Sequence, residues 1–103
     1  MDNLDGRLSL ESLAMKRGIP FIFGAVEGYM GMVSFIDNST KKLEDFIHRF
    51  KSEKTQVLGA TAGFIASIQA LEAIKYLSGK GDLLKNKILL YDALSTNFLE
   101  VSL

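Results

Sequence analysis

Apolar residues recur along this chain with two periods, one typical of helices and the other of strands. The longest apolar segment begins at Thr55 and carries no charged residue through Leu71. At about 100° per residue, its small residues fall within one sector of a helix, so another backbone can approach that side closely. The pattern predicts a helix over 57–78 that is buried nearly all round in its first half, with a polar side only in its last turns. The small residues are Gly59, Ala62, Gly63, Ala66, Ala70 and Ala73, and the polar ones are Gln69, Glu72, Lys75 and Tyr76.

Shorter patterns predict the other elements. Gly18 fits the position just after a last helical turn, and Pro20 prevents the helix from continuing. The last two strands are expected to form an antiparallel pair, because only a few residues separate them. The predicted helices are 4–17, 41–52 and 57–78, and the predicted strands are 20–25, 29–37, 87–92 and 97–102.

Three glycines, Gly24, Gly28 and Gly31, interrupt the first two predicted strands. Their spacing matches neither the dinucleotide-binding nor the Walker pattern, and no helix follows directly. Bulges and a tight connection between the strands therefore explain them better than a phosphate-binding loop.

Composition narrows the possible functions. The 103 residues have the length of one small domain, and 12 basic and 12 acidic residues give zero formal net charge. Because no basic cluster is denser than Lys16-Arg17 or Lys41-Lys42, nothing indicates nucleic-acid binding. The chain has no cysteine, which excludes disulfides, thiolate zinc sites and a cysteine nucleophile.

Neither a membrane span nor a secretory leader is indicated. The uncharged segment 55–71 includes several polar residues and falls short of the ~20 predominantly apolar residues that a spanning helix needs. No apolar leader precedes Asp2, so we expect the protein to be cytoplasmic.

Four segments occur in an order that resembles the C-terminal part of the ThiF/MoeB/HesA family of adenylyltransferases, which are bacterial relatives of ubiquitin-activating enzymes. They cover most of the chain. The resemblance implies an α/β fold, the C-terminal half of a Rossmann-like ThiF-type domain, with a mixed sheet of about four strands and three helices. Residues 1–103 would form a single partial domain, with 38–56 as a crossover-like connection. The four segments are Asp2-Asn3 followed by Arg7, GIPFIFGAVEGYMGMVSF at 18–35, LGATAGFIASIQALEAIKYLSG at 58–79 and ILLYDALSTNFLEV at 88–101.

Members of this family use ATP and magnesium to adenylate the C-terminal carboxylate of a small ubiquitin-like protein, often a sulfur carrier. The resemblance implies that Asp2 is the catalytic residue and magnesium ligand, and that Asp2 and Asn3 bind the nucleotide. Asp2 has a second interpretation, because a carboxylate at a helix N-terminus is itself stabilising by ~0.3–1 kcal/mol. Both interpretations remain open. The resemblance further assigns a structural role to Arg7, more as an ion pair than as a phosphate ligand, and it places Gly24, Ala25 and Gly31 beside the groove for the partner's tail.

Three family features are missing from these 103 residues. The nucleotide-binding half would precede Asp2, the two cysteine pairs that often bind structural zinc would flank the crossover segment, and some members carry a further cysteine for sulfur or thioester transfer. We therefore expect no zinc site, no cofactor bound by this chain alone and no activity without the ATP-binding half. The alternative is a stand-alone binding or assembly module. In either case uncovered apolar surface favours a homo-oligomer, most simply a dimer.

Overall fold

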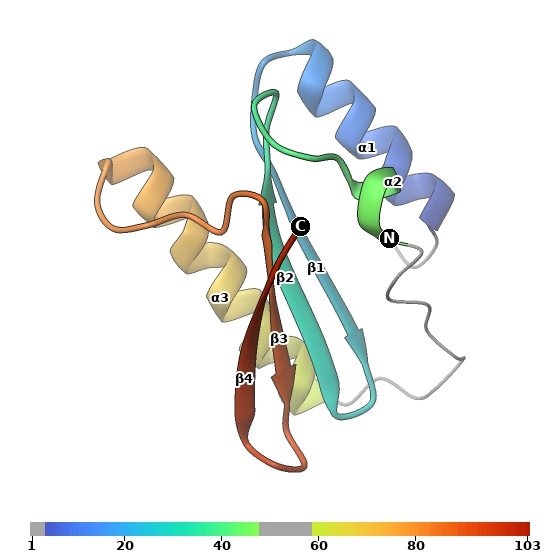
Figure 1. The fold of residues 1–103 in the computed structure, drawn as a ribbon, viewed down its shortest axis with the longest axis vertical. Helices are drawn as coiled ribbons and strands as arrows, with labels where there is room; N and C mark the ends of the chain where they lie inside the picture. The colour runs from blue at the N-terminus through green and yellow to red at the C-terminus, as the bar shows by residue number, and fades with distance from the viewer. Residues whose placement is uncertain (1–3, 48–58) are drawn as a thin grey trace.

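A computed structural model describes residues 4–47 and 59–103 of the chain (Figure 1). It contains a four-stranded sheet of order β1-β2-β3-β4, with α1 and α2 on one side and α3 on the other. The helices are α1 (Leu4–Lys16), α2 (Leu43–Phe46) and α3 (Gly59–Ser78), and the strands are β1 (Phe21–Glu27), β2 (Met30–Ile36), β3 (Lys87–Asp92) and β4 (Asn97–Ser102).

The predicted α/β fold class is confirmed, and each predicted element is present within a few residues of its expected bounds. The exception is the helix expected over 41–52. Its described part is the short α2, and positions 48–52 lie outside the described residues, as do positions 48–56 of the connection predicted over 38–56.

The strand directions correct one detail of the prediction. All three ladders are antiparallel, and the parallel pairing found among the described residues is an isolated bridge between Phe35 and Lys85. The described sheet is therefore antiparallel rather than mixed. Tight hairpins join β1 to β2 and β3 to β4, which forces those pairs to be antiparallel, and the connection through α3 returns the chain so that β3 runs against β2.

Side chains of alternating residues pack against different helices on the two faces of the sheet. On the face toward α1 and α2, Phe23 is 1% exposed and its ring meets the ring of Phe46 edge-on at 6.3 Å between centroids. This cluster is the main hydrophobic core. Its buried members are Phe23, Ile36, Leu43, Phe46 and Ile88.

The face toward α3 is built differently, because two of its positions are glycines. A Cβ placed on Gly31 would lie 2.5 Å from the side chain of Ile65, and one placed on Gly24 would overlap the amide of Gln69. The pairing of β1 with β2 is continuous through both glycines, so they are not bulges. Their function is to let α3 approach the sheet closely.

The expectation that the first half of α3 is buried nearly all round is wrong. Only one side of the helix faces the sheet, and its buried residues are Thr61, Ile65 and Glu72. Small residues such as Gly63 lie on the exposed side. Of the residues predicted to form the polar side of the last turns, Glu72 is only 2% exposed, whereas the apolar Leu77 is 81% exposed. The described sheet covers one helix face only, so the apolar outer face has no cover from it.

Glycines with positive φ make two of the turns, as the sequence predicts. Gly18 has φ +68° and follows α1, with its N–H donating to the carbonyl of Met15. Gly28 has φ +57° and makes the tight connection between β1 and β2.

Candidate functional site

The structure places the predicted site residues in three different environments. Asp2 and Asn3 lie outside the described residues. Arg7, on α1, holds its guanidinium 5.5 Å from the centroid of the Phe23 ring. Within residues 4–47 and 59–103, the contact of Arg7 is thus with an aromatic ring rather than with a carboxylate. This position is consistent with a structural role, because a guanidinium over a ring is attracted by its π-electrons.

The three residues predicted to border the partner's tail do not share one face. Gly24 and Gly31 lie together beneath α3, where side chains of that helix fill the space above them. Ala25 packs on the opposite face, against the main hydrophobic core. The groove itself stays a prediction.

β1 is an outer strand of the described sheet, and the direction of the hydrogen bonds shows which of its backbone groups point outward. The N–H of Phe35 donates to the carbonyl of Leu84, at 3.0 Å, so Phe35 directs its backbone groups toward the β3 side of the sheet. Directions alternate along an antiparallel strand, and Phe35 is paired with Ile22. The backbone groups of Ile22, Gly24 and Val26 therefore point away from β2, toward the outer side of the described sheet.

One group on this edge already has a partner. The side-chain Nε2 of Gln69 crosses over Gly24 and donates to the carbonyl of Ile22 at 3.1 Å. Because α1 and α3 both pack on β1, the edge has a helix on each face. Such an arrangement can bind an extended chain through backbone hydrogen bonds. It contains no nucleophile or acid–base pair.

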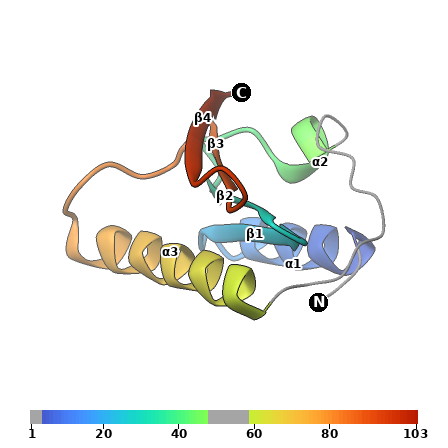
Figure 2. The same cartoon turned by 90° about the horizontal axis from the view of Figure 1, so that it is seen from below.

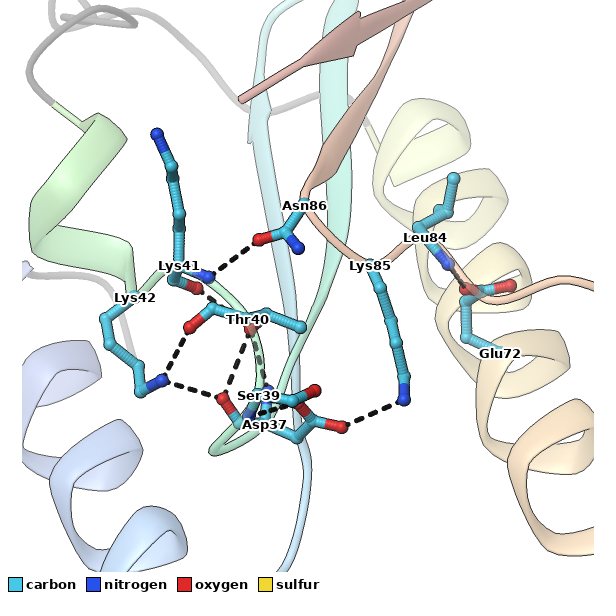
Figure 3. A network of polar contacts seen from close by, with 9 residues as sticks. All are labelled: Asp37, Ser39, Thr40, Lys41, Lys42, Glu72, Leu84, Lys85 and Asn86. Carbon is cyan, nitrogen blue, oxygen red and sulfur yellow. Dashed lines mark hydrogen bonds and ion pairs between the residues drawn. The ribbon is translucent and has the colours of Figure 1, made fainter.

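A second candidate region is a polar network that joins the loop after β2 to the loop before β3 (Figure 3). Asp37 accepts hydrogen bonds from the N–H and the hydroxyl of Ser39, at 2.8 and 2.6 Å, and pairs with the ammonium of Lys85 at 3.2 Å. The ammonium of Lys42 donates to the carbonyls of Asp37 and Thr40. The network holds the loop in one conformation, so we assign it a structural role.

Asn86 and Glu72 also hold these loops in place, each by accepting a backbone hydrogen bond. The N–H of Lys41 donates to the side-chain oxygen of Asn86, whose own φ is +56°. Glu72, which is 2% exposed on α3, accepts a hydrogen bond from the N–H of Leu84 at 2.7 Å and pairs with Lys75. Sequence reasoning did not identify the contacts of Asp37, Asn86 or Glu72. For Asp37 a signal existed, since Asp followed two residues later by Ser is typical of a turn in which the carboxylate accepts that backbone N–H.

Glu11 is a buried carboxylate on α1. It accepts a hydrogen bond from the N–H of Leu43, the first residue of α2, at 2.5 Å. Burial raises the pKa of Glu11, and the hydrogen bond from Leu43 only partly offsets this effect. Because a helix begins with N–H groups that have no partner inside the helix, Glu11 fixes where α2 starts against α1.

The Asp37 network predicts a dependence of stability on pH. Burial by itself would raise the pKa of Asp37, but hydrogen bonds from Ser39 and the contact with Lys85 outweigh it and hold the pKa below its ordinary value. A carboxyl whose pKa is lower in the folded state stabilises the fold above its unfolded pKa of about 4, and that stabilisation is lost as pH falls through the folded pKa.

We therefore expect Asp37→Asn to lower the free energy of unfolding at neutral pH and to bring the variant closer to the unmodified chain as the pH falls below about 4. Urea titrations at a series of pH values measure this difference. Glu44→Gln is the control for removing an exposed carboxylate from the same region. A difference between Asp37→Asn and the unmodified chain that stays constant down to acid pH would contradict the assignment.

The part of the chain that the structure describes has neither a metal-binding group of side chains nor a membrane-spanning helix. No group of three or more His, Cys, Asp or Glu side chains there is arranged to hold a metal ion. Among the same residues, no helix is long and apolar enough to cross a membrane.

Comparison with known proteins identifies the family. The family model described as "ThiF family" matches residues 1–103. The chain belongs to the ThiF family. A probable molybdopterin-synthase adenylyltransferase of Porphyra purpurea is 30% identical over 106 aligned positions, which cover 94% of this chain and 28% of that ThiF relative. An adenylyltransferase and sulfurtransferase MOCS3 of Drosophila grimshawi is 50% identical over 42 residues, which cover 41% of this chain and 9% of that protein.

Solved structures confirm the ThiF-type fold. The crystal structure of E. coli MccB with ATP matches with a TM-score of 0.73 at 13% identity, covering 99% of this chain and 34% of MccB. MccB with selenomethionine MccA matches with a TM-score of 0.72 at 12% identity, covering 97% of this chain and 33% of MccB. The chain spans about a third or less of the ThiF-family relatives and structures that it matches.

Proposed function

We propose that these residues form the partner-binding part of an ATP-dependent adenylyltransferase that activates the C-terminal carboxylate of a small ubiquitin-like or sulfur-carrier protein. The observation that carries the proposal is the family match over the whole chain, together with a relative named as a molybdopterin-synthase adenylyltransferase. The MccB structure with ATP supports a nucleotide-using fold. We propose a cytoplasmic location for this activity.

The described residues do not fit a complete nucleotide site. They offer no cluster of three acidic or histidine ligands, and the glycines of β1 and β2 are occupied by contacts with α3. We therefore propose that ATP and magnesium are held mainly by a nucleotide-binding half outside these 103 residues, with Asp2 and Asn3 contributing to that site. The 103 residues alone would then be inactive. Their own contribution is to bind and orient the partner's tail, which raises the rate of a reaction that depends on alignment.

An exchange assay between ATP and pyrophosphate tests the proposal. The 103-residue chain, mixed with a small carrier protein, is expected to show no exchange. When these residues are joined to a nucleotide-binding half, exchange is expected, and Asp2→Ala is expected to abolish it while carrier binding stays measurable. Asp5→Ala, in the first turn of α1, is the matched control and should retain exchange. Exchange by the 103 residues alone would contradict the division of roles, and full activity of Asp2→Ala would remove Asp2 from the site.

The alternative is a non-catalytic binding or assembly module that keeps this fold. The exposed apolar residues on the outer face of α3 favour it, because such a surface supports association. A homodimer is proposed under either function. The two functions differ in one result: a module binds its partner with unchanged affinity whether or not a nucleotide-binding half and ATP are supplied.

A further inference from the structure

We propose that Glu11 is a pH-sensitive switch, which holds α2 against α1 more tightly in acid than at neutral pH. This inference concerns the motion of α2 and does not depend on adenylation. In chain order α2 is followed by α3, so the docking of α2 also fixes one end of the connection between these two helices.

The surroundings of α2 allow it to move as a unit. The loop before it is held by the Asp37 network, in which the ammonium of Lys42 donates to the carbonyls of Asp37 and Thr40. The helix itself is docked by its apolar side, where Leu43 is 0% and Phe46 is 1% exposed. Figure 2 shows that α2 lies across the strands from α3. A pivot of α2 about the fixed loop would therefore expose Leu43 and Phe46 and leave the packing of α3 unchanged.

Glu11 is the polar contact between α1 and α2. Its side chain is 6% exposed, and its Oε2 accepts the N–H of Leu43 at 2.5 Å. Within residues 4–47 and 59–103 it forms no ion pair. A buried carboxylate without an ion partner is costly to ionise. The docked position of α2, which buries Glu11, therefore opposes the charged form of the same side chain.

The charges around Glu11 add to this effect of burial. The neighbours that act on it lie at the start of α2, where the like charges of Glu44 and Asp45 oppose its ionisation and Lys42 favours it. Burial is the largest effect, and the pKa of Glu11 is raised while α2 is docked. The charged groups on the other elements that pack here are Asp5, Arg7 and Lys16 on α1 and Glu27 at the end of β1.

The direction of the switch follows from linkage between protonation and docking. Undocking of α2 returns Glu11 to water, where its pKa has the ordinary value of 4.5. Because the pKa is higher in the docked state, docking is strongest below pH 4.5 and weakens as the pH rises through the docked-state pKa. The apolar burial of Leu43 and Phe46 keeps α2 docked most of the time, so the proton changes the population of a minor open state.

The test measures amide exchange by NMR in the full 103-residue chain. The N–H of Leu43 donates to Glu11 and that of Ile47 to the carbonyl of Leu43, so both exchange when α2 opens. Relative to the amide of Ile65 on α3, we expect their protection factors to fall about threefold or more from about pH 4.5 to about pH 7.5. In Glu11→Gln, which keeps an acceptor oxygen but has no proton to lose, this ratio is expected to stay constant. Asp5→Asn, in the first turn of α1, is the matched control and should keep the fall.

The amide resonance of Leu43 in the unmodified chain provides a second measurement that does not depend on how the variants fold. Its chemical shift is expected to titrate with a midpoint above pH 4.5, because its N–H donates to the titrating carboxyl. A midpoint at or below pH 4.5, or a protection ratio that is constant with pH, overturns the proposal and leaves Glu11 as a structural contact only. A fall in protection that persists in Glu11→Gln, or that Asp5→Asn removes, assigns the pH dependence to another group and also overturns it.

Discussion

Replacing Glu72 with alanine is expected to lower the free energy of unfolding by about 2 to 4 kcal/mol. The carboxylate is 2% exposed, and it accepts the N–H of Leu84 at the start of the segment that leads into β3. Its loss leaves that N–H without its acceptor and removes the ion partner of Lys75. The connection between α3 and β3 then loses one of the hydrogen bonds that hold Leu84 in place. The hydrogen bond from the N–H of Phe35 on β2 to the carbonyl of Leu84 remains.

Glu72→Gln separates the two contributions of this carboxylate. Glutamine keeps a side-chain oxygen that can accept from Leu84, but it gives up the charge that attracts Lys75. We expect a loss of about 1 kcal/mol, well below that of the alanine variant, because Lys75 is partly exposed and water weakens the ion pair. Urea unfolding followed by circular dichroism measures both. Equal losses for the two variants would show that the ion pair, and not the hydrogen bond to the loop, makes the contribution.

The elements were predictable from sequence because they depend on local signals. Gly18 and Pro20 end α1 through backbone conformation alone, and the alternation of apolar residues marks β1 and β2. The orientation of α3 was not predictable in the same way. Its uncharged sequence gives no contrast between sides, so the side that faces the sheet is chosen by Gly24 and Gly31, which are distant in sequence and admit Gln69 and Ile65.

The candidate site shows the same division between local and distant signals. The glycines of β1 and β2 stand out in the sequence, but their partners on α3 depend on strand register and helix position together. The polar contacts of Asp37 with Lys85 and of Lys41 with Asn86 join segments far apart in the chain, and single lysines and asparagines carry no pattern that indicates such partners. The position of β1 at one end of the described sheet is likewise a property of the strand order, which hydrophobic periodicity does not specify.

Replacing Phe23 with alanine is expected to cost about 3 to 5 kcal/mol of unfolding free energy, the largest loss that we predict for a single side chain. Its ring is 1% exposed, meets Phe46 of α2 edge-on and lies under Arg7 of α1. It therefore joins β1 to both helices on that face. Phe98→Ala is the control for losing an aromatic ring, because Phe98 is 54% exposed on β4, and we expect a clearly smaller effect from it.

Phe23→Leu tests whether the ring itself matters, in addition to its volume. Leucine fills much of the same space, so we expect a loss of about 1.5 kcal/mol or less from packing. It cannot attract the guanidinium of Arg7 as a ring does. If Arg7 acts structurally through this contact, then Arg7→Gln destabilises the unmodified chain by about 0.5 to 1 kcal/mol and has almost no further effect in the Phe23→Leu background. Additive losses in the double variant would show that Arg7 acts through another partner, and the position of α1 over the β1 edge would then rest on its apolar contacts alone.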